Sequence, residues 1–323
     1  MPFDRNAALT YASKYWNRAC DDDRVAIESG SVPINDKRKA MDAPRDKGWE
    51  VYFVSDGGRG ENAVFARMVG DKLVETKPDP VLTDLKDHLD DCTHYVSHCL
   101  LNEGITVKPT NRANELIEAL IKNPNAKVLA LKTDQTEGQK IIDSGIFKVG
   151  DVVGYYAEEK GRYHHSAMYI GDANSTGGKI KGGITCHSVC RFGGRTQAWN
   201  GANDDAWFIN ETSGSYTLIH FTADDPQLLD GNLLGWWQLG DNYYRVAADG
   251  TAKSTKIAPR DKDERLRHGD ASAQLLQGSN EIIFVWQRAH GKIEVEKWSL
   301  GMRTRNVASV QTTNGPDTAT KLF

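Results

Sequence analysis

The order of the secondary-structure patterns along the chain most constrains its fold. Helical spacing occurs before Gly150, in residues 4–18, 92–104, 112–123 and 135–143. After Gly150 the pattern changes to short strand-like runs separated by turns that contain Gly, Lys and Asn. Helices followed by strands predict the α+β class, with an antiparallel sheet, because a parallel sheet would need alternating strands and helices.

Two domains are expected from the length and from one polar, Pro-containing segment. A chain of 323 residues is long for a single core, and residues 223–230 (ADDPQLLD) are the best linker candidate. We therefore predict one domain over 1–222 and a small Trp-rich, β-barrel-like domain over 231–323, whose aromatic residues mostly fill its core. Residues 20–90 are irregular and turn-rich, and we interpret them as an insertion in the first domain.

The composition is that of a globular protein and argues against several classes of function. Charged residues make up 26% and hydrophobic residues 39%, so disorder is not expected. A net charge of -4 argues against a nucleic-acid surface. No apolar stretch reaches the ~20 residues of a membrane helix, and residues 1–20 lack a secretory signal pattern. We therefore expect synthesis in the cytoplasm and no membrane span.

One of the five cysteines lies where a helix is expected to begin, in the segment DDCTHYVSHCL. The backbone N–H groups and the dipole at a helix start favour a thiolate, so Cys92 is a candidate nucleophile, with a buried structural thiol as the alternative. A metal site is a rival, but its ligands would lie on two faces of one helix. Its members would be Cys92, His94, His98 and Cys99. His94 and His98 alone, which point roughly opposite to Cys92, remain a candidate pair.

Three histidines on the expected strands are candidates for a general base. In RYHHSAMYIGD, strand alternation sends His164 and His165 to opposite sides, so the pattern alone does not choose between them. His187 lies on the next expected strand, flanked by Cys186 and Cys190. Each histidine has an alternative interpretation as a structural residue of its strand.

The chain resembles the bacterial amidase-domain family, relatives of the NlpC/P60 and CHAP hydrolases. The resemblance covers about residues 4–221. It rests on four segments: DRNAALTYASKYW, DDCTHYVSHCL, GDVVGYY leading into HHSAMYIGD, and ITCHSVCR followed by Trp199. The resemblance implies a papain-like fold, with helices packed on an antiparallel sheet, and a cysteine amidase that uses neither a cofactor nor a metal.

The same resemblance assigns roles to three residues. In such enzymes a cysteine attacks an amide carbonyl, a histidine activates it, and a polar residue on the next strand orients the histidine. The implied residues are Cys92, His165 and His187, in that order of roles. Three further residues flank them in the matching segments, and we assign them to substrate binding: Asp91, His164 and Trp199.

The resemblance implies hydrolysis of a peptide or amide bond in bacterial peptidoglycan. A chain without a visible signal would then need a specialised secretion apparatus, as for an antibacterial effector with an immunity protein. One alternative is a cysteine protease or deamidase toxin that acts on proteins; another is a non-catalytic protein that binds glycans or a partner. Relatives commonly carry Asn and Gln in place of His94 and His98, and the segment before Cys92 is long, so the substrate stays open.

Overall fold

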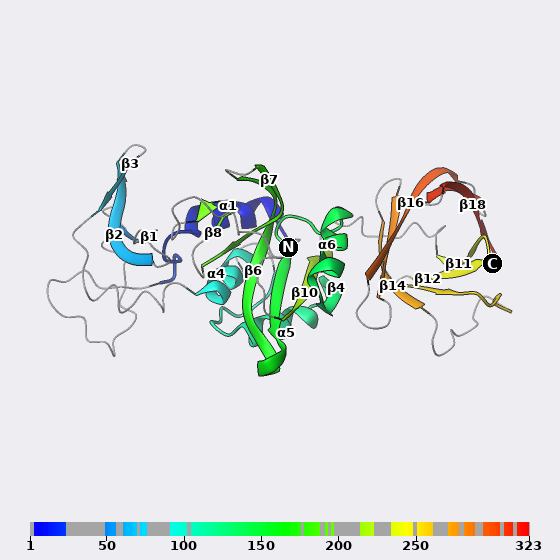
Figure 1. Cartoon of the computed structure of the whole chain (residues 1–323), viewed down its shortest axis with the longest axis horizontal. Coiled ribbons are helices and arrows are strands. Elements are labelled where there is room, and N and C mark those ends of the chain that lie inside the picture. The colour runs from blue at the N-terminus through cyan, green and yellow to red at the C-terminus, as the bar shows by residue number, and fades with distance from the viewer. Residues whose placement is uncertain are drawn as a thin grey trace. The chain divides into compact units, whose positions relative to one another are not determined.

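The computed structural model shows a mixed α/β protein with several antiparallel sheets (Figure 1). The chain divides into two compact units, one of residues 1–122 and 148–214, the other of residues 123–147 and 215–323. The division predicted from sequence assigns residues 123–147 to the first domain instead. The structure describes residues 3–23, 49–55, 61–69, 72–75, 91–101, 105–175, 178–187, 191–192, 195–196, 214–222, 234–247, 251–260, 271–277, 281–287, 293–303, 307–312 and 315–322.

Helix α1, Arg5–Tyr15, forms where the sequence predicts an amphipathic opening helix. Asp4 caps it, because its carboxylate accepts hydrogen bonds from the backbone N–H groups of Asn6 and Ala7, both at 3.0 Å. The side chains on the inward face are all buried: Ala8, Tyr11, Ala12 and Tyr15. The sequence predicts both a helix here and Asp4 as its cap, and the structure confirms both.

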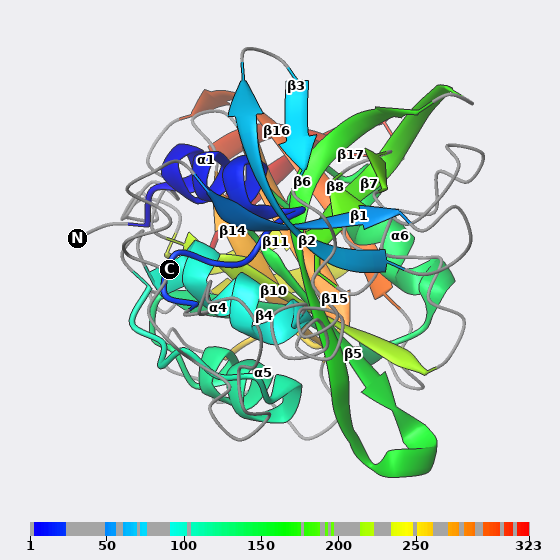
Figure 2. The same cartoon turned by 90° about the vertical axis from the view of Figure 1, so that its left-hand side faces the viewer.

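Three further α-helices are described: α4 (Cys92–Leu101), α5 (Ala113–Ile121) and α6 (Gln135–Asp143). Each coincides with a predicted helix to within a few residues. In the first unit, α1, α4 and α5 lie together beside strand β6, Arg162–Ser175 (Figure 2). None of the described helices is long and apolar enough to cross a bilayer.

The first unit contains strands in the order β5-β6-β7-β8-β9, and β4 pairs with β10 in the second unit. Consecutive strands from β5 to β9 pair antiparallel, as do β4 and β10. The strands besides β6 are Ala126–Thr133 (β4), Val152–Ala157 (β5), Gly178–Cys186 (β7), Arg191–Phe192 (β8), Arg195–Thr196 (β9) and Ser215–Phe221 (β10). The run AWFIN predicts a further strand over residues 206–210, and this range lies outside the described residues.

A small antiparallel sheet lies within the expected insertion over residues 20–90. It consists of β1 (Glu50–Ser55), β2 (Glu61–Val69) and β3 (Lys72–Glu75). The segment directly after α1 runs along β1: Ala19 N donates to Val51 O at 2.9 Å, and Phe53 N donates to Asn17 O at 2.8 Å. These backbone hydrogen bonds fix the position of the residues that follow Ala19.

The eight strands from residue 235 onward form a closed barrel in the second unit, in which β11 pairs with β18. They are Gly235–Leu239 (β11), Asn242–Val246 (β12), Thr251–Thr255 (β13), Ala271–Gln277 (β14), Glu281–Gln287 (β15), Ile293–Arg303 (β16), Val307–Thr312 (β17) and Gly315–Lys321 (β18). The sequence predicts hairpin turns at the DG pair of residues 249–250 and the HG pair of residues 290–291, and both pairs lie outside the described residues. A barrel removes the exposed edges of an open sheet.

Aromatic side chains fill the barrel core around one carboxylate. Trp286 and Trp298 donate from Nε1 to the Glu296 carboxylate at 3.0 and 2.7 Å, and the Tyr244 hydroxyl donates to it at 3.2 Å. Phe284 stacks on Trp286 with ring centroids 5.6 Å apart. These four aromatic residues are buried, as the sequence predicts, so their rings are not exposed for stacking on sugars.

Removal of the Phe284 ring should destabilise the barrel strongly. The ring is fully buried, so we expect Phe284→Ala to lower the free energy of unfolding by about 3–5 kcal/mol. The matched control is Ile257→Ala, whose side chain is 48% exposed and should change the value by no more than about 0.5 kcal/mol. Urea unfolding of the full chain, followed by Trp fluorescence, measures both, and equal effects would contradict this packing.

Candidate active site at the start of helix α4

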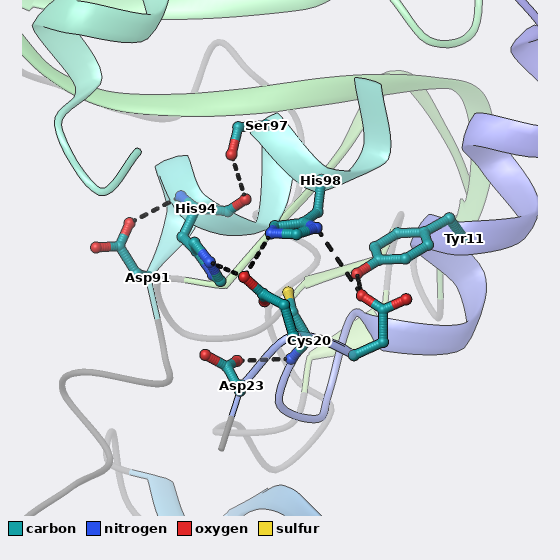
Figure 3. Close-up of polar contacts among 9 residues, drawn as sticks. Tyr11, Cys20, Asp23, Asp91, His94, Ser97 and His98 are labelled. Carbon is teal, nitrogen blue, oxygen red and sulfur yellow. Dashed lines mark hydrogen bonds and ion pairs between the residues drawn. The ribbon is translucent and has the colours of Figure 1, made fainter. Parts of the chain in front are cut away.

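Helix α4 begins at Cys92, and Asp91 is its N-cap. The Asp91 carboxylate accepts hydrogen bonds from Thr93 N at 2.9 Å and His94 N at 3.1 Å, the second of which is drawn in Figure 3. Cys92 is therefore the first residue of the helix, and its thiol is 8% exposed. A thiol in this position lies at the positive end of the helix dipole, where a thiolate is stabilised.

Burial affects the protonation of the capping carboxyl. Desolvation raises the pKa of Asp91 above its usual value, although the hydrogen bonds from the backbone N–H groups of His94 and Thr93 favour its charged form. A nearby positive charge on His165 also acts to lower that pKa. His165 is therefore within electrostatic reach of the helix start that carries Cys92.

Strand β6 carries the two adjacent histidines, and its register shifts between them. His165 pairs with Tyr155 of β5, whereas Tyr163 pairs with Tyr156, which leaves His164 as an extra residue on β6. Such an extra residue is a β-bulge, and bulges locally redirect side chains. The bulge therefore interrupts the regular alternation on which the prediction for His164 and His165 rests.

His165 is buried, with 5% of its surface exposed, and its ring lies 4.8 Å from the ring of Tyr155. Its Nε2 atom forms no hydrogen bond with any of the described residues. Buried ring nitrogens usually have a partner, so this nitrogen can accept or donate a proton to a further group. The neighbouring His164 is half-buried.

Two hydroxyl groups connect the helix start to strand β6. Ser166 Oγ donates to Thr93 Oγ1 at 3.3 Å, and Thr93 Oγ1 lies 3.5 Å from Cys92 Sγ. The residues that directly follow Cys92 and His165 are thus in contact. Sequence reasoning did not assign a role to Thr93 or Ser166, although both lie within the segments that carry the resemblance.

His187 follows strand β7 and is fully buried against α1 and α4. Its Nε2 donates to the backbone carbonyl of Tyr15 at 2.7 Å, and its ring stacks on Tyr95 with centroids 4.2 Å apart. The carbonyl bond places the proton on Nε2, so Nδ1 is left as the acceptor nitrogen in the neutral ring. Trp199 and Cys190 lie outside the described residues, and none of the four described cysteines is in a disulfide.

Loss of the Asp91 cap should destabilise the start of helix α4. Asp91→Ala should lower the free energy of unfolding by about 0.5–2 kcal/mol, because two backbone N–H groups lose their acceptor, whereas Asp91→Ser should retain most of the stability. Thermal and urea unfolding of both variants checks this. An Asp91→Ala variant as stable as the wild type, with only its KM changed, would instead indicate a role confined to substrate binding.

Comparison with known proteins identifies the family of the chain. Residues 2–210 match the model of a family described as a putative amidase domain. The matched range contains Asp91, Cys92, His165 and His187. No curated protein and no solved structure matches the chain. Because the family model covers more than half of the sequence, the chain belongs to this amidase-domain family.

Proposed function

We propose that the protein is a cysteine-dependent amide hydrolase with Cys92 as the nucleophile. The observation that carries the proposal is the position of Cys92 as the first residue of α4, in a chain that belongs to an amidase-domain family. The helix dipole and the backbone N–H groups at this position favour the thiolate over the thiol. The contact between Thr93 and Ser166 supports a site formed jointly with strand β6.

The proposed reaction has two steps. The Cys92 thiolate attacks the carbonyl carbon of the amide and forms a tetrahedral intermediate, whose oxygen accepts a hydrogen bond from the Cys92 backbone N–H. The C–N bond then breaks, His165 donates a proton to the leaving amine, and a thioester remains on Cys92. Water, deprotonated by His165, hydrolyses the thioester, which releases the carboxylic acid and restores the thiol.

His187 acts in this scheme as a positioning residue. Its Nε2 proton is held by the Tyr15 carbonyl, so only its Nδ1 can accept a hydrogen bond from the His165 ring. An acceptor at this place would fix the tautomer of His165 and stabilise the imidazolium that forms during the reaction. The stacking of His187 on Tyr95 limits its rotation and supports this role.

Peptidoglycan is the proposed substrate, and its peptide or amide bonds are the proposed targets. The protein would then act as an exported antibacterial effector with an immunity partner. In this scheme Asp91 caps the nucleophile helix, and His164 and Trp199 contact the substrate. The papain-like arrangement of α4 against the antiparallel strands is part of the same proposal and rests on the sequence resemblance.

If peptidoglycan is the substrate, its cleavage should depend on the Cys92 thiol. Purified peptidoglycan incubated with the wild type should release new muropeptides, detected by mass spectrometry, and Cys92→Ala should release none, because it has no nucleophile. Cys99→Ala, which removes the other thiol of the same helix, is the matched control and should retain activity. Identical digests from the wild type and Cys92→Ala would exclude a cysteine amidase of peptidoglycan and favour a protein substrate or a binding function.

If His165 is the base, its removal should lower the reactivity of the Cys92 thiol. Iodoacetamide should alkylate Cys92 more slowly in His165→Ala than in the wild type near neutral pH, by at least about tenfold, because the thiolate loses its stabilising partner. His164→Ala is the matched control and should react at the wild-type rate. Peptide mapping by mass spectrometry gives the rate at each cysteine. The opposite pattern would identify His164 as the base.

A further inference from the structure

A second cluster of reactive side chains lies on helix α4, where His94 and His98 project from the same side (Figure 3). His94 and His98 lie one helical turn apart, and both direct Nε2 towards the same carboxylate oxygen of Asp22. The distances to Asp22 Oδ2 are 3.2 Å from His94 Nε2 and 3.0 Å from His98 Nε2. We call Asp22, His94 and His98 the Asp22 cluster.

Hydrogen bonding alone does not account for this arrangement. His94 and His98 are each 5% exposed, and neither ring nitrogen of His98 forms a hydrogen bond with the described residues, although Asp22 Oδ2 lies only 3.0 Å from its Nε2. The two atoms form a close ion pair whose angles do not meet hydrogen-bond geometry. Buried polar atoms without a hydrogen bond need an explanation, and a bound ion is one of the common ones.

The spacing of the ligand atoms fits a small transition-metal ion. Bonds of about 2.0 Å to nitrogen and oxygen, in tetrahedral geometry, place neighbouring ligand atoms about 3.3 Å apart. The two distances to Asp22 Oδ2 are close to this value, and the three ligand atoms all lie within 4.8 Å of one another. Two imidazoles and one carboxylate form a ligand set that suits Zn²⁺.

A fourth ligand is available beside the cluster. The sulfur of Cys20, a carboxylate oxygen of Asp23 and a ring nitrogen of His94 form a second group within 4.8 Å of one another, and all three residues are buried. Cys20 N donates to Asp23 Oδ2 at 2.8 Å, which fixes the turn that carries both residues. His94 belongs to both groups, so the sulfur of Cys20 lies within 4.8 Å of a ring nitrogen of His94, although Cys20 is not part of the group that His94 forms with Asp22 and His98.

Outer contacts of the type found around metal-bound histidines are also present. The Nδ1 atom of His98 lies 3.9 Å from Asp21 Oδ1, and the Tyr11 hydroxyl donates to the same oxygen at 2.7 Å. A carboxylate near the second ring nitrogen favours the tautomer in which Nε2 is free to bind a metal. Tyr11 also stacks on His98, with ring centroids 6.2 Å apart, which restricts the ring.

The Asp22 cluster has a route to solvent. A hollow of about 290 Å³ borders Asp22 and His94, and its other walls come from α5 and the residues before it, among them Lys108, Thr110 and Glu115. Asp22 is partly exposed, with 41% of its side chain accessible, whereas the two histidines are covered. An ion could therefore reach the cluster without unfolding of the chain.

We propose that Asp22, His94 and His98 bind one Zn²⁺ ion, with the Cys20 thiolate as the fourth ligand. The ion joins the second turn of α4 to the segment after α1 and thereby holds the helix that begins at Cys92. Its role is structural, because His94 and His98 lie by helical spacing on the side of α4 opposite to Cys92, and Asp22 lies in the segment after α1. The proposed zinc site does not depend on the amidase reaction or on its substrate.

Zinc binding by the full chain, purified without a histidine tag, tests the proposal. The chelator-treated wild type should bind one Zn²⁺ per chain in competition with a chromophoric chelator, and His94→Asn/His98→Gln should lower the affinity by at least about 100-fold. The control Asp241→Asn removes an exposed carboxylate from the second unit and should leave the affinity unchanged. A wild type that binds no zinc, or a double variant that binds as well as the wild type, would overturn the site.

A second variant distinguishes loss of the metal site from loss of the fold. Asp22→Asn alters only a partly exposed side chain, and circular dichroism verifies its structure. Added Zn²⁺ should raise the Tm of the wild type and not that of Asp22→Asn, because an ion that binds only the folded state stabilises it. Equal shifts in both would exclude Asp22. With Co²⁺ in place of Zn²⁺, a thiolate charge-transfer band that disappears in Cys20→Ser supports Cys20 as a ligand, and its absence in the wild type excludes it.

Discussion

Helix α4 is buried along nearly its whole length, and this burial determines much of the first unit. Every residue from Cys92 to Leu100 is buried, including its polar ones. Buried polar groups must find partners inside the protein. The Tyr95 hydroxyl donates to the Ala12 carbonyl of α1 at 3.1 Å and lies 2.7 Å from Thr185 Oγ1 of β7. On the same helix, Thr93 accepts a hydrogen bond from Ser166 of β6, and His94 contacts Asp22 in the segment after α1. The helix start is thereby fixed against three other elements.

The sequence predicts the helices well because their signals are local. Asp4 and Asp91 precede helices α1 and α4 and cap them, and the apolar spacing that follows extends over only a few turns. The surroundings of His94 and His98 are not local. Helical spacing turns both away from the Cys92 side, but the segment containing Asp22 covers them, because backbone pairing with β1 brings it there. Helical spacing describes only one helix, so it does not predict that contact.

The pairing of the strands also depends on contacts that the local sequence pattern does not predict. The bulge at His164 depends on the pairing of β5 with β6, so alternation along one strand could not reveal it. In the second unit, the alternating aromatic residues indicate strands, but closure of the barrel requires β11 to pair with β18, far along the chain. Strands β11 and β12 are joined by a tight turn at Gly240, which has a φ of 57°, and Asp241.

The central claim is that Cys92 carries the acyl group during amide hydrolysis, and trapping that intermediate tests it most directly. Muropeptide substrate mixed with the wild-type chain would be quenched in acid within the first turnover, and the protein analysed by intact mass and peptide mapping. The account predicts a thioester adduct on the peptide that contains Cys92, and no adduct in Cys92→Ala. Cleavage of the substrate without any adduct, or with an adduct on another residue, would contradict it.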